Sequence, residues 1–376
     1  MPEFEATTAS LEGTGRATPR ELMTLLAADG RQTRALLAAA DRVRAAVAGD
    51  EVHLRALIEF SSHCRRNCRY CGLRRDNGGL ARYRMRPEEI RAAARAAADL
   101  GYQTVVLQSG EDAGCDIRQL AHVIGGIKRD RELAVTLAIG ERSAEDYAVL
   151  RGAGADRFLL RVETSSPALY RRLHPDSGWR GRVRALPVLR RLGYQIGSGV
   201  MIGLPGQSLR TLADDLLLLQ SLDLDMIGVG PFIPHPATPL AGARAGDLDL
   251  ALRFIACLRM LCPAALIPAT TALAARDPAR GWERGLAAGA DVLMPNVTPL
   301  CYRARYDIYA GKMWNSHAPA DFRPRVDDLL ARMGRRPGAG PGHSRIRRTA
   351  MPALCSDETA RAAVTRGRSL RWKEQM

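Results

Sequence analysis

Long apolar runs and secretory signals are missing from this sequence, and their absence narrows the class of protein. No apolar stretch in the 376 residues approaches the length of a membrane span, and the first residues carry no basic region followed by an apolar core. The apolar content of 46% and charged content of 25% are ordinary for a soluble globular protein. Thiols that cluster without a disulfide-like pattern favour a reducing compartment, so we expect a cytoplasmic protein without membrane partners.

Lysine is also scarce, since only three of the 55 basic residues are lysine: Lys128, Lys312 and Lys373. Arginine therefore carries the net charge of +15. The charge is spread through amphipathic patterns such as residues 88–100, where it is typical of a solvated helix face, and it is concentrated only in residues 334–376. No recognition motif and no interleaved aromatic residues accompany it, so nucleic-acid binding is not favoured.

Three of the eight cysteines stand close together, at Cys64, Cys68 and Cys71, directly after the apolar run 57–60. This C-x3-C-x2-C spacing offers three thiolates to one centre and leaves one coordination position without a protein ligand. A 4Fe-4S cluster held in this way keeps one iron open to a substrate or cofactor. The spacing therefore favours chemistry at iron.

A structural zinc site is the alternative, with His63 or a distant residue as its fourth ligand. Zinc sites usually pair cysteines as C-x2-C with a second pair further on, and the chain has no second C-x2-C or H-x3-H pair. Tyr70, directly before the last cysteine, also fits a radical enzyme better than a zinc knuckle. Iron–sulfur is the preferred interpretation.

Apolar periodicity predicts one large barrel behind a short helical region. Residues 1–18 are predicted to be a disordered lead, residues 19–49 two helices, residues 50–330 the barrel, and residues 331–376 a basic, disordered tail. In the barrel region, eight short apolar strands alternate with amphipathic helices, which is the pattern of a (β/α)8 TIM barrel rather than of a doubly wound sheet. The predicted strands are residues 52–61, 104–110, 134–140, 157–163, 195–204, 226–233, 266–271 and 292–298. The predicted helices between them are residues 87–100, 116–130, 143–152, 167–173, 181–192, 208–221, 247–262 and 281–288.

Polar residues follow the predicted strands at their carboxyl ends, where barrel enzymes place functional groups. Residues 109–112 offer acceptors for an ammonium group beside exposed backbone, and Glu163 could accept a hydrogen bond from a ribose or amine. Arg182 could pair with a carboxylate in fork geometry. Such groups suit S-adenosylmethionine, whose amine and carboxylate can chelate an open iron. Each also has a structural interpretation, for example an ion pair between Arg161 and Glu163.

The sequence resembles the HydE family of radical S-adenosylmethionine proteins, which are maturases of FeFe-hydrogenase. The resemblance covers roughly residues 20–315 in collinear order. It rests on the cysteine triplet and on the stretches 58–61, 72–77, 82–85, 106–112, 201–207, 230–236, 267–272 and 294–296. Biotin synthase and methylornithine synthase share the barrel and the triplet, but Gln-Ser-Gly-Glu-Asp at 108–112 and Ile-Pro-His-Pro at 233–236 look more like HydE.

The resemblance implies that Cys64, Cys68 and Cys71 hold a 4Fe-4S cluster that chelates S-adenosylmethionine and cleaves it to methionine and a 5′-deoxyadenosyl radical. In HydE-type maturases this radical acts on a sulfur-bearing substrate derived from a cysteine-bound iron carbonyl cyanide, an organometallic precursor. The candidate cofactor-binding residues are Tyr70, Gln108, Ser109, Gly110, Glu111, Asp112, Glu163 and Arg182. The candidate substrate residues are Thr136, Arg157, Arg161, Val162, Thr270, Thr271 and Tyr306. A ferredoxin or flavodoxin as electron donor and other hydrogenase maturases are the implied partners.

The sequence departs from the family pattern at two places. Residues 314–327 contain no cysteine where many members carry a second cluster motif, and Val162 stands where the family often has a histidine. An apolar side chain cannot donate the hydrogen bond of an imidazole. The alternative function is therefore a HydE-like radical enzyme with another substrate, such as an amino-acid mutase or a sulfur-handling step. A zinc-stabilised, arginine-rich nucleic-acid-binding protein is the distant alternative.

Overall fold

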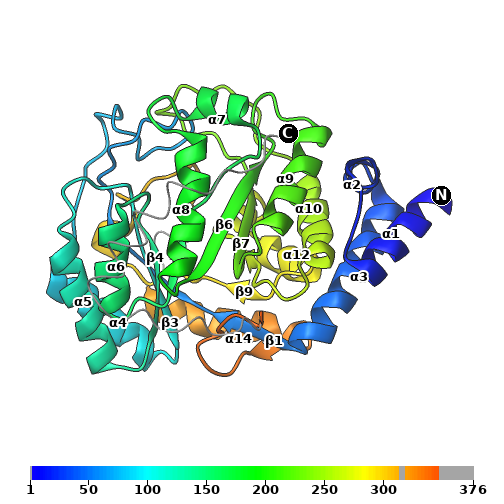
Figure 1. The fold of residues 1–376 in the computed structure, drawn as a ribbon. Helices are drawn as coiled ribbons and strands as arrows, with labels where there is room; N and C mark the ends of the chain where they lie inside the picture. Colours follow the sequence, from blue (N-terminus) through cyan, green and yellow to red (C-terminus); the bar gives the residue numbers. More distant parts are fainter. Residues whose placement is uncertain (1, 313–317, 347–376) are drawn as a thin grey trace.

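The computed structural model describes residues 2–312 and 318–346, in which parallel strands curl into one sheet with helices on its outer face (Figure 1). From β2 (Ala56–Ser61) to β9 (Val292–Leu293), each strand pairs with the next strand along the chain. β9 pairs in turn with β1 (Glu51–Leu54), and the bridge Leu57↔Asn296 extends this contact. Because β1 leads directly into β2, these pairings close the sheet, and the predicted TIM barrel is confirmed.

The remaining strands are β3 Thr104–Ser109, β4 Ala134–Ala138, β5 Arg157–Leu159, β6 Gln195–Ile202, β7 Met226–Pro231, β8 Pro268–Ala269 and β10 Arg336–Pro337. The helices are α1 Pro2–Thr14, α2 Pro19–Leu26, α3 Gly30–Ala48, α4 Pro87–Asp99, α5 Ile117–Asp130, α6 Ala144–Gly152, α7 Pro167–Leu173, α8 Trp179–Arg191, α9 Leu209–Ser221, α10 Leu248–Leu261, α11 Thr271–Arg276, α12 Gly281–Ala287, α13 Leu300–Arg303 and α14 Pro319–Arg332. Among these described helices, none combines the length and apolar character that a bilayer span requires.

Side chains alternate between the two faces of the barrel strands. In β3 and β4, the odd-numbered residues 105, 107, 135 and 137 belong to the hydrophobic core beneath the helices. Since successive side chains of a strand point to opposite faces, Val106, Gln108 and Thr136 point into the barrel. This alternation decides which of the predicted residues can meet a substrate.

Four predicted strands differ clearly from the observed ones. The last two, 266–271 and 292–298, are ladders only over Pro268–Ala269 and Val292–Leu293, and α11 already begins at Thr271. The other two are the first and the fourth. The first, 52–61, is divided at Arg55 into β1 and β2, because β1 pairs with β9 and β10 whereas β2 pairs with β3. The fourth, 157–163, is a ladder only over Arg157–Leu159. Its continuation leaves the extended conformation at Glu163, whose φ is +64°. The division at Arg55 lies toward the amino end of the barrel, and the bend at Glu163 lies at its carboxyl end.

The predicted disordered lead, residues 1–18, is wrong, because α1 forms there and buries Phe4 and Leu11. α1 packs against α3, and α3 packs against α10 on the outside of the barrel, as the dark blue helices of Figure 1 show. Its own sequence carries little amphipathic signal. The helix is stabilised by its neighbours, which a local pattern does not reveal.

The predicted disordered tail, residues 331–376, is wrong for residues 331–346, while residues 347–376 lie outside the described part of the chain. β10 pairs with β1, and the following segment crosses the amino end of the barrel. The carbonyls of Pro341 and Gly342 accept hydrogen bonds from Nη2 of Arg157 at 2.7 and 3.0 Å. Gly342 has φ +59°, and a Cβ there would lie 2.6 Å from the ring of His53. Backbone polar groups are thus satisfied by a buried arginine, which keeps the segment in place.

Candidate active site

The cysteine loop leaves the carboxyl end of β2 and contacts the end of β3 and the segment after α13. Gly72 donates its N–H to the carbonyl of Ile308 at 3.1 Å, and Arg65 donates its N–H to the carbonyl of Glu111 at 2.9 Å. At Gly110, a Cβ would lie 2.8 Å from the Cβ of Cys64. The end of β3 can therefore approach the first cysteine only because residue 110 lacks a side chain.

The three thiols fit an iron–sulfur cluster by their surroundings. Burial raises the pKa of Cys64, and it raises the pKa of Cys71 to about 12. The pKa of Cys68 is raised well above its usual value by burial and by the nearby Cys71 and Cys64. Three thiolates gathered in one half-buried loop need a cationic centre to hold them, and a cluster of iron ions supplies that charge.

Within residues 2–312 and 318–346, no group of three or more His, Cys, Asp and Glu side chains is arranged to hold a single metal ion. A 4Fe-4S cluster binds each thiolate through a different iron, so its ligands lie further apart than the ligands of one ion. Cys64, Cys68 and Cys71 would hold such a cluster.

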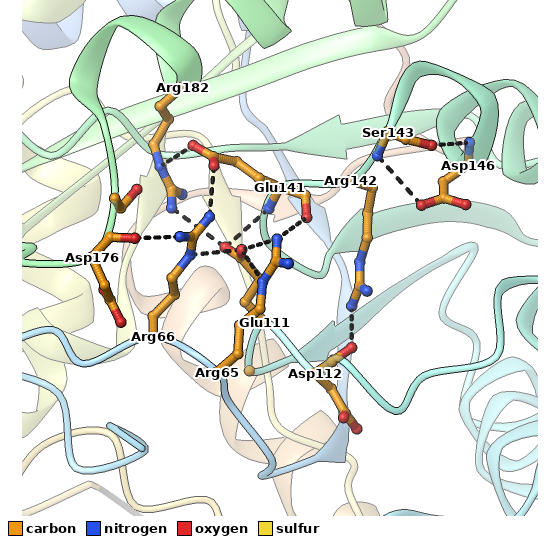
Figure 2. Close-up of polar contacts among 12 residues, drawn as sticks. Arg65, Arg66, Glu111, Asp112, Glu141, Arg142, Ser143, Asp146, Asp176 and Arg182 are labelled. Atoms are coloured by element: carbon orange, nitrogen blue, oxygen red, sulfur yellow. Dashed lines mark hydrogen bonds and ion pairs between the residues drawn. The ribbon is translucent and has the colours of Figure 1, made fainter. Parts of the chain in front are cut away.

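A network of three arginines and two glutamates braces the cysteine loop (Figure 2). The buried Glu111 pairs with Arg65 and Arg66, each at 2.7 Å, and with Arg182 at 3.5 Å. Glu141 pairs with Arg66 at 2.8 Å and with Arg182 at 3.1 Å. Burial alone would lower the pKa of Arg182, but the neighbouring Tyr170, Glu141 and Glu111 raise it. The network joins the loop to the ends of β3 and β4 and to α8, so Glu111 and Arg182 are brought together as an ion pair.

Asp112 fixes the two ends of the same loop rather than facing its thiols. Its carboxylate accepts hydrogen bonds from the hydroxyl of Ser61 at 2.7 Å and from Nε of Arg84 at 2.6 Å. Although burial raises the pKa of Asp112, the hydrogen bonds from Arg84 and Ser61 lower it on balance. The neighbouring Ser109 donates its hydroxyl to the carbonyl of Gly110 at 2.7 Å. Both side chains are engaged within the protein, although the Ser109 hydroxyl keeps its acceptor lone pairs, and their contact with the cofactor stays a prediction.

Tyr70 is held by a histidine that sequence reasoning missed. The phenol oxygen lies 2.8 Å from Nε2 of His174, and Nδ1 of His174 lies 3.0 Å from the carbonyl oxygen of Tyr170. Since a carbonyl only accepts, Nδ1 carries the proton and Nε2 accepts from Tyr70. Burial lowers the pKa of His174 to about 4, which keeps the ring neutral. His174 thus orients the tyrosine ring beside Cys71, and only its place at the end of the predicted helix 167–173 could have drawn attention to it.

Glu163 has a strained backbone that a second buried carboxylate supports. A φ of +64° is uncommon for a residue with a side chain, and such strain gathers at functional sites. Asp215, on α9, accepts from the N–H of Ser165 at 2.5 Å and from the hydroxyl of Thr164 at 3.2 Å. Gln207 donates to the same carboxylate at 3.2 Å. Burial raises the pKa of Asp215 to about 6. Asp215 therefore holds the turn that presents Glu163.

Two predicted substrate residues do not take their expected places. Val162 is fully buried in the core between the sheet and the helices, because Arg161 and Glu163 occupy the opposite face of the strand. The prediction that Val162 lines the substrate cavity is wrong. Arg157 lies at the amino end of β5, where its guanidinium group binds the backbone of residues 341–342. It cannot form the predicted anion clamp with Arg161, whose Nε pairs with Glu163 at 3.1 Å.

The other predicted substrate residues lie inside the barrel or at its carboxyl end. Thr136 is buried, and its hydroxyl has no hydrogen-bond partner within residues 2–312 and 318–346. Thr270 donates its hydroxyl to the carbonyl of Val229 at 3.0 Å, and the Thr271 hydroxyl lies 2.7 Å from that of Tyr309. Tyr306 is buried and hydrogen-bonded to the predicted cofactor residue Gln108, although burial remains the main cause that raises its pKa. A free hydroxyl inside the barrel is suited to a polar ligand.

A buried ion pair at the same end was not anticipated. Nζ of Lys312 lies 2.5 Å from both carboxylate oxygens of Glu59, and Asn296 donates to Oε2 of Glu59 at 2.9 Å. Nζ also donates to the carbonyl of Tyr306 at 3.0 Å. The pair fastens the segment after α13 over the carboxyl end of β2. A glutamate inside an apolar strand and one of only three lysines were its signals in the sequence.

Comparison with known proteins defines the class of this site. Residues 58–219 match the radical SAM superfamily. The chain is 49% identical over 304 residues to the [FeFe] hydrogenase maturase subunit HydE of Thermotoga maritima, covering 81% of this chain and 87% of that one. It is 30% identical over 285 residues to 3-methylornithine synthase of Methanosarcina barkeri, covering 75% and 80%.

Solved structures agree on the fold. The crystal structure of methylornithine synthase (PylB) superposes with a TM-score of 0.79 at 27% identity, covering 88% of this chain and 97% of that one. The maturase HydG superposes with a TM-score of 0.76 at 19% identity, over 90% of this chain and 76% of that one, which shows the shared fold alone. The protein is a radical SAM enzyme, for which a 4Fe-4S cluster and S-adenosylmethionine are the cofactors. Within that class, the chain belongs to the HydE family.

Proposed function

We propose that this enzyme acts on a sulfur-containing, cysteine-derived substrate in the maturation of the di-iron cofactor of FeFe-hydrogenase. The observation that carries this proposal is the 49% identity to the Thermotoga maritima maturase over 81% of the chain, with the three thiols at the carboxyl end of the barrel. The free cysteines among the described residues agree with the reducing cytoplasm in which we place the enzyme.

When bound at Cys64, Cys68 and Cys71, the cluster supplies the electron that cleaves S-adenosylmethionine to methionine and a 5′-deoxyadenosyl radical. The residues of the chain position and shield this chemistry. We assign Tyr70, held by His174, and Glu163, held by Asp215, to orientation of the cofactor. We assign Arg161, Thr136 and Thr271 to a polar substrate. Arg161 and Thr271 follow the carboxyl ends of β5 and β8, and the buried Thr136 hydroxyl has no hydrogen-bond partner among the described residues. Burial excludes water there.

The test is anaerobic reconstitution followed by two assays. The protein should bind about four irons, since one cluster holds that number, and should release 5′-deoxyadenosine from S-adenosylmethionine. Extracts that contain the other maturases but lack HydE should then activate apo-hydrogenase only when this protein is added. A protein that cleaves the cofactor but does not restore hydrogenase activity would contradict the maturation role.

A radical mutase acting on an amino-acid-derived metabolite is the second candidate. It is favoured by the similarity to methylornithine synthase in sequence and in fold. Consumption of lysine with the appearance of an isomeric diamino acid, together with failed hydrogenase activation, would select this function.

A further inference from the structure

The surface around the cysteine loop carries more positive charge than the ion pairs with Glu111 and Glu141 neutralise. From residue 64 to residue 84 the chain has seven arginines and a single acidic residue, Asp76. The whole chain has 55 basic and 40 acidic residues, so this short segment is far more basic than the average. The buried carboxylates of the bracing network neutralise part of the charge from inside.

The exposed part of this charge forms one continuous area. Nη1 of Arg75 donates to the carbonyl of Arg65 at 3.2 Å, and the N–H of Arg69 donates to the carbonyl of Leu173 at 2.9 Å. Leu173 ends α7, whose last turn carries Arg171 and Arg172. We call Arg65, Arg69, Arg75, Arg171 and Arg172 the basic face; all five are exposed. α7 lies over the carboxyl end of the barrel (Figure 1).

The face is poor in accessible carboxylates. Arg65 pairs with Glu111, which is only 4% exposed, and Arg75 shares Asp76 and Asp176. In the part of the chain that the structure describes, no carboxylate lies within ion-pair distance of Arg69 or Arg171. Positive charge that is not matched at the surface attracts an acidic partner and orients its approach.

The face also adjoins the thiols. Arg65 directly follows Cys64, and Arg69 directly follows Cys68. A protein bound to Arg65 and Arg69 would therefore contact residues directly adjacent in sequence to two predicted cluster ligands. Since electron transfer weakens steeply with distance, this is the side from which a cluster in the loop is most readily reduced.

We propose that the basic face binds an acidic one-electron carrier protein that reduces the cluster. The inference rests on the proposed radical chemistry, which needs one electron for each cleavage. In the step itself one electron passes from the reduced carrier to the cluster, the carrier is oxidised by one electron, and no bond is made or broken. Such contacts are small and transient, and charge governs their association rate.

The test compares two charge-reversed proteins after cluster reconstitution. The variant Arg69→Glu/Arg171→Glu reverses two of the unmatched charges of the face, and Arg31→Glu/Arg34→Glu makes the same change of net charge on two exposed residues of α3. Stopped-flow bleaching of the cluster absorbance is followed with reduced flavodoxin and, separately, with dithionite. With flavodoxin, the face variant should react about tenfold or more slowly and lose much of its salt dependence, whereas the control should react like the wild type. With dithionite, all three proteins should react alike.

Equal rates with flavodoxin for the face variant and the α3 control would overturn the proposal. Because Arg69 lies inside the cysteine loop, Arg171→Glu/Arg172→Glu provides a second variant outside it, with the same expected slowing. Tight binding of a labelled DNA duplex that is lost in the face variant, with unchanged flavodoxin rates, would assign the face to nucleic acid instead. A wild-type protein that assembles no cluster would refute the proposed function, whereas a wild type that dithionite reduces and flavodoxin does not would refute only the docking face.

Discussion

The two ends of the barrel use arginine in opposite ways. At the carboxyl end, Arg65, Arg66 and Arg182 pair with glutamates and remain linked to a loop that carries the thiols. At the amino end, Arg55 and Arg157 donate to backbone carbonyls of residues 341–342, and burial lowers the pKa of Arg157 to about 10. The first arrangement places charge around a reactive centre, while the second closes the fold. The same residue type therefore predicts function at one end and stability at the other.

The largest expected effect is loss of the iron–sulfur cluster at the carboxyl end of the barrel. Replacing Cys68 by alanine leaves two thiols, so no stable cluster should assemble and cleavage of S-adenosylmethionine should stop. Cys301→Ala, at an exposed cysteine outside the loop, is the control and should keep both. Iron analysis and the yield of 5′-deoxyadenosine measure the effect. A C68A protein with full iron content and wild-type cleavage would contradict the view that the carboxyl end of the barrel holds the reactive centre.

At the amino end, Arg157→Ala should act on stability. It removes a charged donor from the carbonyls of Pro341 and Gly342, which keep Thr104 and Arg55 as their remaining donors, at a cost of about 2–3 kcal/mol in the free energy of unfolding. Arg336→Ala removes an exposed pair with Asp50 and should cost about 0–1 kcal/mol. Denaturant unfolding of the apoproteins measures both. Equal costs would show that segment 338–346 contributes nothing to the stability of the barrel.

Behind Glu163, the expected effect is a change in pH dependence. The pKa of Asp215 is raised from 3.8 to about 6, so the folded protein retains a proton that the unfolded chain has released. The stabilisation from this proton is complete below pH 3.8 and is lost as the pH rises to about 6, with a change of up to about 3 kcal/mol. Asp215→Asn should remove this dependence. Asp214→Asn, at a half-exposed neighbour, should preserve it, and a D215N protein with the wild-type pH profile would refute the assignment.

The smallest expected effect distinguishes two neighbouring residues, Val162 and Arg161, whose side chains point to opposite faces of the sheet. Val162→Ala should lower the free energy of unfolding by about 1–3 kcal/mol without changing the turnover of a bound substrate, because Val162 faces the helices. Arg161→Ala should do the reverse, with little loss of stability and a reduced rate for the substrate-dependent reaction. Denaturation midpoints and single-turnover rates separate the two. A V162A protein with altered substrate specificity would place that residue back in the cavity.

The barrel and the cysteine loop could be predicted because both are local patterns: short apolar strands at regular spacing, and three thiols within eight residues. Glu59 and Lys312 could not, since their contact joins residues 253 positions apart. α1 was missed because its burial depends on α3 and α10 rather than on its own pattern. Val162 could have been placed correctly, since the alternation of side chains puts it opposite Arg161 and Glu163.

The segment that crosses the amino end has a consequence for traffic through the enzyme. In the part of the chain that the structure describes, residues 338–346 and the apolar layer of Met226, Leu266 and Val292 cover the amino end of the barrel and leave its carboxyl end as the route to the interior. Substrate, cofactor and products therefore share the carboxyl end as their route, where the cysteine loop and the Lys312–Glu59 pair lie. A ligand bound near this end therefore limits the exchange of any molecule bound deeper in the barrel.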